Sequence, residues 1–254
     1  MPFTGAHPMA VLPFLRWKVP LRLDPTSLVI GSMAPDFEYF AHGEQAGSFS
    51  HTLLGVAVFC IPATFILGFI WDWLVRRPWL VIAPVWLRRR LVSEPWQARW
   101  TIGVVASCLV SAAIGALTHL GWDGFTHAQG FITRRVPALH TPIDVPVLGV
   151  LALHRVLQYA SSVIGLVVLA IVVVRMLRRR PAIELPAARR LWPRLIFLAC
   201  IATGTTLLTL RVLAHHLRDP GDVAVGAISG MLAGVIVASA IVRLGFSRTV
   251  AAVG

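Results

Sequence analysis

The feature that most constrains this chain is a series of five apolar stretches. A helix that crosses the hydrocarbon core of a bilayer needs about 20 mostly apolar residues. Such segments are helical because lipid offers no partners to backbone polar groups. The sequence therefore predicts an all-α, polytopic membrane protein with about five transmembrane helices and an extracytoplasmic cap of helices and loops. The expected spans are about 52–75, 101–120, 156–174, 195–213 and 224–242.

Details of the spans add to this prediction. Pro62 lies inside the first span and predicts a kink there. The fifth span is rich in small residues (GAISGMLAG), which permit close helix packing. Two shorter apolar pieces, 9–15 and 79–87, cannot span and are expected at the membrane interface.

Composition supports a membrane protein over a soluble one. Hydrophobic residues make up 57% of the chain and charged residues 13%, with a mean hydropathy of +0.76; soluble domains carry about 25% charged residues. The net charge of +12 would suit nucleic acid, but the arginines flank apolar segments, so membrane lipids are the expected partners and nucleic acid is not. The three cysteines fall in apolar runs and predict neither a disulfide nor a cysteine metal site: Cys60, Cys108 and Cys200.

Arginine placement predicts the orientation, because loops rich in Lys and Arg stay in the cytoplasm. With five spans, 15 of the 23 Lys and Arg residues lie in the loops after spans one and three and in the C-terminal tail. We therefore expect an outside N-terminus, with 1–51 as an outer segment, and a cytoplasmic C-terminus in one integral domain over 1–254. The first twenty residues do not resemble a cleaved signal peptide.

All nine histidines then fall outside or at the outer ends of spans. The sharpest motif is THLGWDGFTH, in which His119 and Asp123 are four residues apart and share a helix face. His127 follows after another four residues. Imidazole and carboxylate groups in this spacing suit a divalent metal such as zinc.

Other segments contribute candidate ligands. SMAPDFEYF supplies Asp36, SHTLLG supplies His51, and GAHP supplies His7. His140 and Asp144 repeat the four-residue spacing, although Pro142 between them makes a regular helix doubtful. The alternative for each single residue is helix capping or hydration among headgroups. His42 and His154 are the expected bystanders, and at most one of the adjacent pair His215 and His216 would face a helical site.

Two further outer-side residues are candidates for phosphate recognition. Arg134 and Arg135 carry planar guanidinium groups that can bind phosphate oxygens in pairs. The alternative is that both side chains reach toward lipid headgroups.

The segments MPFTGAHPMAVLP, GSMAPDFEYF, SHTLLG and THLGWDGFTH resemble a family of bacterial multi-pass membrane proteins of unknown function that begin with MPFT and a His-Pro. This resemblance covers nearly the whole chain. It implies a bacterial cytoplasmic (inner) membrane protein and carries no established activity.

The order of these residues is also similar to the ligand order of zinc-dependent phospholipase C and P1-type nucleases, and of membrane-bound metal-dependent hydrolases. That resemblance implies that the protein binds one to three divalent metal ions and that the expected metal is zinc. In this resemblance Asp123 would bridge two ions. The chain differs from the phospholipase in two respects: the phospholipase has glutamate at the position of Asp144, and it has no membrane spans. The implied sets are Asp36, His51, His119 and Asp123 for one ion, His7 and Asp123 for a second, and His127, His140 and Asp144 for a third.

These observations lead to one functional hypothesis and two alternatives. The leading one is a metal-dependent hydrolase at the outer membrane face that cleaves a phospholipid or another lipid-linked phosphoester, with Asp36 as a ligand or water-orienting base. One rival is a scaffold or small transporter, although spans nearly free of charge at their centres weigh against translocation. The other keeps the metal but makes it structural.

Overall fold

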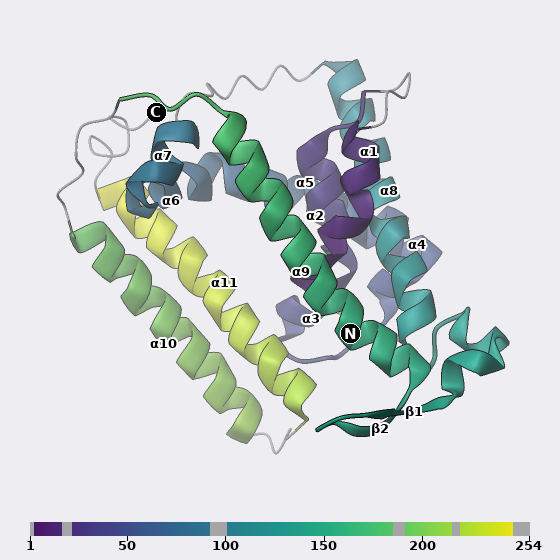
Figure 1. Cartoon of the computed structure of the whole chain (residues 1–254). Coiled ribbons are helices and arrows are strands. Elements are labelled where there is room, and N and C mark those ends of the chain that lie inside the picture. Colours follow the sequence, from purple (N-terminus) through teal and green to yellow (C-terminus); the bar gives the residue numbers. More distant parts are fainter. Residues whose placement is uncertain (1–2, 17–21, 92–100, 185–190, 215–218, 246–254) are drawn as a thin grey trace. The chain divides into compact units, whose positions relative to one another are not determined.

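The computed structural model describes residues 3–16, 22–91, 101–184, 191–214 and 219–245. Five helices in these ranges have the length and composition to cross a membrane. Each helix is longer than its predicted span. The predicted spans include only the apolar stretch, whereas the helices also include more polar residues beside it. The prediction of a helical, polytopic membrane protein is confirmed by these helices (Figure 1): Leu53–Ile82, Ile102–Thr126 (α8), Leu153–Arg179 (α9), Trp192–Ala214 (α10) and Pro220–Gly245 (α11).

The first of these helices changes its winding twice. A π-helical turn immediately precedes Pro62, where the sequence predicts a kink. Proline lacks an N–H and crowds the preceding turn, so a wider turn accommodates it. Residues 79–82, expected at the interface, instead end this helix. Its segments are α4 (Leu53–Gly55), η4 (Val56–Cys60, π), α5 (Ile61–Ile70), η5 (Trp71–Val75, π) and α6 (Arg76–Ile82).

Shorter elements connect the long helices. The β-hairpin β1–β2 is an exception to the all-α expectation; it is antiparallel, with Pro142 paired to Ala152. Its turn includes Val147 at φ 72° and Gly149 at φ 76°. The remaining elements are η1 (Thr4–Val11), α1 (Leu12–Arg16), α2 (Pro25–Gly31), η2 (Ala34–Asp36), α3 (Phe37–His42), η3 (Phe49–His51), α7 (Val85–Leu91), η6 (Thr133–Arg135), η7 (Pro137–His140), β1 (Pro142–Val145) and β2 (Gly149–Ala152).

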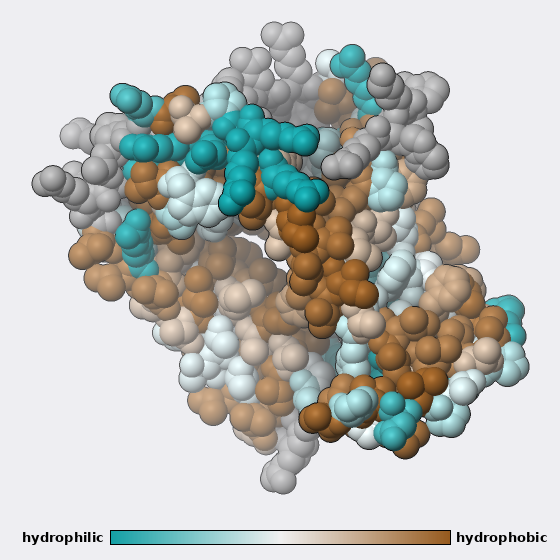
Figure 2. Space-filling model, viewed as in Figure 1, coloured by the Kyte–Doolittle hydropathy of each residue, from teal (hydrophilic) through white to brown (hydrophobic). Residues whose placement is uncertain are grey.

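The long helices expose apolar side chains, as expected of helices that face lipid. Val163, Ile164 and Leu198 are each more than half exposed. Figure 2 shows hydrophobic surface along the middle of α9 and hydrophilic surface where α9 ends and over α7. This distribution is the reverse of that in a soluble helical domain, and it follows from lipid being as apolar as the side chains themselves.

The chain forms two compact units, which are described separately; the prediction of one membrane domain stays a prediction. The first unit comprises Met1–Asp36, Ser48–Phe65 and Trp100–Arg175. In it, α2 packs closely against α8: a Cβ on Gly31 would lie 2.6 Å from the backbone oxygen of Ala112. A Cβ on Gly115 would similarly lie 2.5 Å from the backbone oxygen of Leu28. Glycine at these two positions therefore lets the segment that carries Asp36 approach α8.

The second unit comprises Phe37–Gly47, Ile66–Arg99 and Met176–Gly254. Its main contact is between α10 and α11, where the backbones of Gly204 and Gly230 meet directly. Gly234 packs on the backbone of Cys200 one turn further along. The small residues of the fifth span thus serve the close packing that the sequence predicts.

Candidate metal centre

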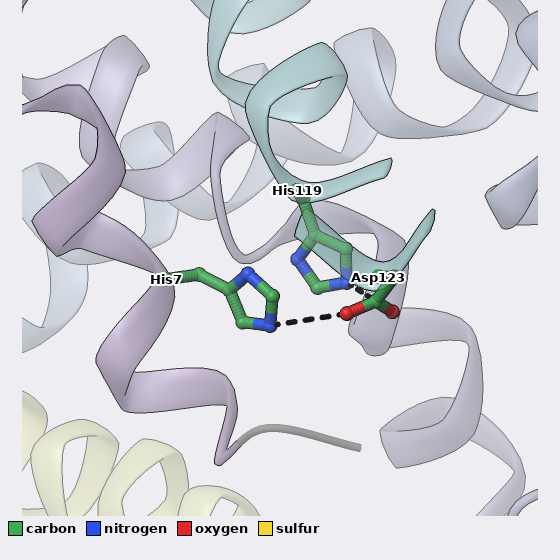
Figure 3. A group of neighbouring side chains, drawn as sticks. All are labelled: His7, His119 and Asp123. Atoms are coloured by element: carbon green, nitrogen blue, oxygen red, sulfur yellow. Dashed lines mark ion pairs between the residues drawn. The ribbon is translucent and has the colours of Figure 1, made fainter. Parts of the chain in front are cut away.

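Five of the predicted ligands converge in the first unit. His7 comes from η1, Asp36 ends η2, His51 ends η3, and α8 contributes His119 and Asp123 from its last two turns. All but His51 are buried, and His51 is partly exposed. Figure 3 shows His7 facing His119 and Asp123 across the gap between η1 and α8. The i,i+4 spacing in α8 places its two ligands on one helix face, as predicted.

Four ligand atoms form a small cage. The Nε2 atom of His51 lies 3.6 Å from Asp36 Oδ1 and 3.6 Å from Asp123 Oδ2. The Nε2 atom of His119 lies 3.5 Å and 3.4 Å from the same two oxygens. Two nitrogens and two oxygens therefore face one common centre.

These distances are characteristic of ligands that share a metal ion. They exceed the usual 2.7–3.2 Å of an N–H···O hydrogen bond. Around a tetrahedral zinc with bonds of about 2.0–2.2 Å, neighbouring ligand atoms lie about 3.3–3.6 Å apart. The four N···O distances of the cage therefore suit ligand atoms of a metal ion.

Asp123 joins this cage to a second group through its other carboxylate oxygen. Oδ2 belongs to the cage, whereas Oδ1 lies 3.7 Å from His7 Nε2 and 3.6 Å from His127 Nδ1. The rings of His7 and His119 are stacked, with centroids 3.7 Å apart. A carboxylate with one oxygen toward each histidine group has the geometry of a bridging ligand. Ligand atoms of His7, His119 and Asp123 lie close enough together to share an ion.

Several of these atoms are buried without a hydrogen-bond partner. In the part of the chain that the structure describes, they include both ring nitrogens of His7, Nε2 of His119 and one oxygen each of Asp36 and Asp123. Buried polar atoms are almost always satisfied in native proteins, and an exception calls for an ion, water or ligand. Their common direction into one small volume favours an ion.

Contacts behind the cage orient two of its imidazoles. The Nδ1–H of His119 donates to the carbonyl of Ser32 at 2.8 Å, which directs Nε2 at the carboxylates of Asp36 and Asp123. Ser50 Oγ donates its one hydrogen to the carbonyl of Pro35 at 2.7 Å. It therefore accepts from His51 Nδ1, 3.0 Å away, which directs Nε2 of His51 toward Asp36 and Asp123. Metal-binding histidines are commonly fixed in this way.

Thr4 orients the Asp36 carboxylate in the same way that the contacts above orient the two imidazoles. Its hydroxyl donates to Asp36 Oδ2 at 2.5 Å, so that Oδ1 is the oxygen directed at the cage. Sequence reasoning missed Thr4, Ser32 and Ser50. Thr4 stands in the MPFT opening and Ser50 directly precedes His51, but a hydroxyl behind a ligand has no spacing rule of its own.

Removing this hydroxyl should weaken metal binding. We expect Thr4→Val, which keeps the side chain's shape, to lower zinc affinity about 10- to 100-fold, the usual effect of losing such an outer partner. Competition with a chromophoric chelator measures the change. Thr4→Ser, which keeps the hydroxyl, should bind nearly as wild type does, and equal affinity in Thr4→Val would show that Thr4 does not orient Asp36.

Metal ligands must be deprotonated, and His7, Asp36 and His127 meet this condition at neutral pH. Burial, followed by the nearby His119, lowers the pKa of His7 to about 3. Burial acts to raise the pKa of Asp36, but the imidazoles of His119 and His51 outweigh it and hold that pKa well below its usual range. Burial also lowers the pKa of His127, against the pull of the Asp123 carboxylate. At neutral pH, His7 and His127 are neutral and Asp36 is ionised.

The low pKa of His7 predicts a pH dependence in metal-free protein. Between pH 6.5, where unfolded histidine titrates, and about pH 3, the unfolded chain holds a proton that folded His7 does not. Stability should therefore fall as the pH drops through this window. Thermal unfolding of wild type and His7→Asn at pH 7 and pH 4.5 tests this: the variant should lose less, and an equal loss in both would contradict it.

The structure does not bring the third predicted set together. Among the described residues, the groups close enough to share an ion are His7, His119 and Asp123, and Asp36, His51 and His119. His140 ends η7 and is exposed beside His154, at 5.4 Å between ring centroids. Asp144 lies in β1, whereas His140 ends η7, so the two residues do not share one helix and the four-residue helical spacing does not bring them together. His127, His140 and Asp144 therefore do not form a ligand set. Pro142 begins β1, so no regular helix joins His140 to Asp144, as its position in the sequence predicts.

The remaining candidates lie outside the cage. Arg134 and Arg135 are exposed on η6, and Arg135 donates to the carbonyl of Phe131 at 2.6 Å. His154 contacts the Leu139 carbonyl and is not in either group. His42 contacts the carbonyl of Ala46, whereas His215 and His216 lie outside the described residues.

Together, fold and site define a multi-pass helical membrane protein with a buried histidine–aspartate group that can hold a metal. A family model described as a domain of unknown function (DUF4184) matches residues 1–240, and the chain belongs to this family. No curated protein and no solved structure matches the chain.

Proposed function

We propose that this protein is a metal-dependent hydrolase of the bacterial cytoplasmic membrane, acting on a phosphoester at the outer face. The observation that carries the proposal is the convergence of His7, Asp36, His51, His119 and Asp123, with N···O distances of 3.4–3.7 Å. Buried ionisable groups at the end of a membrane span are costly and mark functional sites. The outer face follows from the arginine distribution and the N-terminal position of the ligands.

The two groups would have different tasks. The cage of Asp36, His51, His119 and Asp123 offers four ligands and would hold a first ion firmly. The group of His7 and Asp123 Oδ1, with His127 at its edge, would hold a second ion with open positions. An ion of this kind lowers the pKa of bound water and polarises a phosphoryl oxygen. Asp36 acts as a ligand in this scheme, because Thr4 occupies its other oxygen.

Arg134 and Arg135 are the proposed phosphate contacts. Their loop is tied to α8 beside the site, since Thr133 Oγ1 donates to the Gly124 carbonyl at 3.0 Å. Both guanidinium groups are exposed and thus accessible to substrate. Arg134 is the stronger candidate, because Arg135 already donates to its own loop.

Metal content and hydrolysis, measured together, test the proposal. Protein purified without metal and then loaded with zinc or manganese should hold two ions per chain and cleave phosphomono- or phosphodiesters. His7→Ala should keep the first ion, lose the second and lose hydrolysis. Wild-type protein that holds no ion under any loading condition would overturn the proposal.

A structural metal is the second candidate, and the number of histidine and aspartate side chains gathered in the cage favours it. Four protein ligands with no open position are typical of structural zinc. In that case wild type would hold one ion, His7→Ala would keep it, and no phosphoester would be cleaved. A scaffold role without metal predicts that His119→Ala leaves function unchanged.

A further inference from the structure

The N-terminal segment runs alongside a candidate membrane span. Its second arm, residues 22–36, includes α2, which lies beside α8 (Figure 1). At the beginning of this arm, Ser107 Oγ donates to the carbonyl of Arg22. At its other end, the Ser32 carbonyl accepts the bond from His119 described above. The second arm therefore follows α8 in the same direction along the chain.

These contacts give the depth of the second arm. A helix rises about 1.5 Å per residue, so Ser107 lies about 18 Å along α8 from His119. On the same scale, Ser107 is about 9 Å from the beginning of the predicted span at 101. The hydrocarbon core of a bilayer is about 30 Å thick. The second arm therefore begins in the inner third of the bilayer and ends at the outer side.

The first arm, residues 3–16, descends along α9. The Phe3 N–H donates to Ser162 Oγ at 2.9 Å, and a Cβ on Gly165 would lie 3.0 Å from the Cβ of Ala6. In the predicted topology α9 runs from the outer side to the cytoplasmic side, so this order of contacts leads the chain inward. The first arm therefore enters the bilayer from the outside, before the second arm returns.

Serines on the spans satisfy non-helical backbone in both arms. Lipid offers no hydrogen-bond partners, so such backbone is tolerated in a bilayer only where protein supplies them. The bond from Phe3 to Ser162 is one such contact. The Asp24 N–H donates to Ser111 Oγ at 2.8 Å, and the Asp24 carboxylate caps α2 by accepting from the Ser27 N–H at 2.6 Å. These contacts are the ones that a segment inside a bilayer requires.

A turn on the cytoplasmic side also improves the charge distribution. Arg16, Lys18 and Arg22 lie where the two arms meet in the sequence, and they are among the eight Lys and Arg residues outside the predicted cytoplasmic regions. Moving them changes the distribution from 15 against 8 to 18 against 5, in better agreement with the excess of basic residues on the cytoplasmic side. Arg22 is exposed, and an arginine side chain of this kind extends toward headgroups.

We propose that residues 3–36 form a re-entrant hairpin, which enters the bilayer from the outer face and brings the basic residues of its turn to anionic headgroups of the inner leaflet. This proposal replaces the expectation that all of 1–51 lies outside. It also gives 9–15, expected at the interface, a place in the first arm. His7 and Asp36 lie near the mouth of the hairpin, so an ion in the candidate metal centre would join its two arms.

Thiol labelling in membrane vesicles tests the hairpin. Single cysteines replace Arg22, Arg89 on α7 before α8, and Gln129 after α8, all of which are exposed, in a chain whose three native cysteines are changed to alanine. Arg22→Cys should react with a membrane-impermeant maleimide only from the side that labels Arg89→Cys. Because Arg89 and Gln129 mark the two sides, the comparison does not depend on the orientation of the protein.

Each result of this experiment decides part of the proposal. Labelling of Arg22→Cys from the Gln129 side, or from both sides, would overturn the re-entrant hairpin. Protection from both sides, with labelling only after SDS, would keep the hairpin, because Arg22 is exposed in the structure and lipid would have to shield it. That result would overturn the contact with inner headgroups.

Two glycine variants test whether α8 holds the second arm. In the Arg22→Cys chain, Gly115→Val should reduce labelling from the Arg89 side, because a Cβ there would lie 2.5 Å from the Leu28 backbone oxygen. Gly121→Val is the matched control on α8, since a Cβ there meets nothing within 4 Å, and its labelling should be unchanged. Equal labelling in the two variants would show that the contact with α8 does not hold the arm.

Discussion

Replacement of Asp123 by alanine should abolish metal binding at both groups and lower phosphoester hydrolysis by at least about 10³-fold. The reason is that its two oxygens face different histidines, Oδ2 toward His51 and His119 and Oδ1 toward His7. Losing only an outer partner of a metal ligand already costs about 10- to 100-fold in affinity or activity, and the loss of a ligand common to both groups should cost more. Metal counting by mass spectrometry should give no stoichiometric ion, against one ion in His7→Ala.

Asp144→Ala is the matched control for this experiment. It removes a carboxylate of the same size from β1, outside both ligand groups. We expect wild-type metal content and activity. If Asp123→Ala retained one full ion equivalent, its carboxylate would not bridge the two groups.

Removal of metal should destabilise the protein strongly. An ion that binds only the folded state stabilises it by about 4 kcal/mol when present at 1,000 times its Kd. For a chain of this size, 1 kcal/mol corresponds to about 2–4 °C. We therefore expect chelation to lower the melting temperature in detergent by about 8–16 °C, and added zinc to restore it.

A variant without the cage provides the control. His51→Ala removes one of its four ligands, so chelation should lower its melting temperature by less than it lowers that of wild type, because only the second group can still hold an ion. His140→Ala removes an exposed histidine and should respond as wild type does. A chelator effect of equal size in wild type and His51→Ala would mean that the ion responsible binds elsewhere.

The spans were predictable from sequence because the physics of crossing lipid is local. A run of apolar residues identifies a transmembrane helix without knowledge of its neighbours. The ends of the spans were not predictable to the same degree: α8 continues six residues past the predicted end at 120, to Thr126. The hairpin β1–β2 escaped prediction because its pairing depends on a turn around Val147, an unusual residue for a positive φ.

The site was predictable in part for similar reasons. Spacing on one helix identifies His119 and Asp123, and residue order along the chain adds His7, Asp36 and His51. The same spacing failed at His140 and Asp144, because a strand replaces the helix on which the rule depends. The division of the Asp123 oxygens between two groups depends on three-dimensional packing, so no sequence pattern conveys it.

The order in which the ligands occur along the chain has a consequence for biogenesis. The ribosome adds His7, Asp36 and His51 about 70 to 110 residues before His119, an interval of about 3–22 s at roughly 5–20 residues per second. Neither ligand group is complete until α8 has been made. Asp123 emerges last of the five and supplies an oxygen to each group, so stable metal capture follows membrane insertion of the second span.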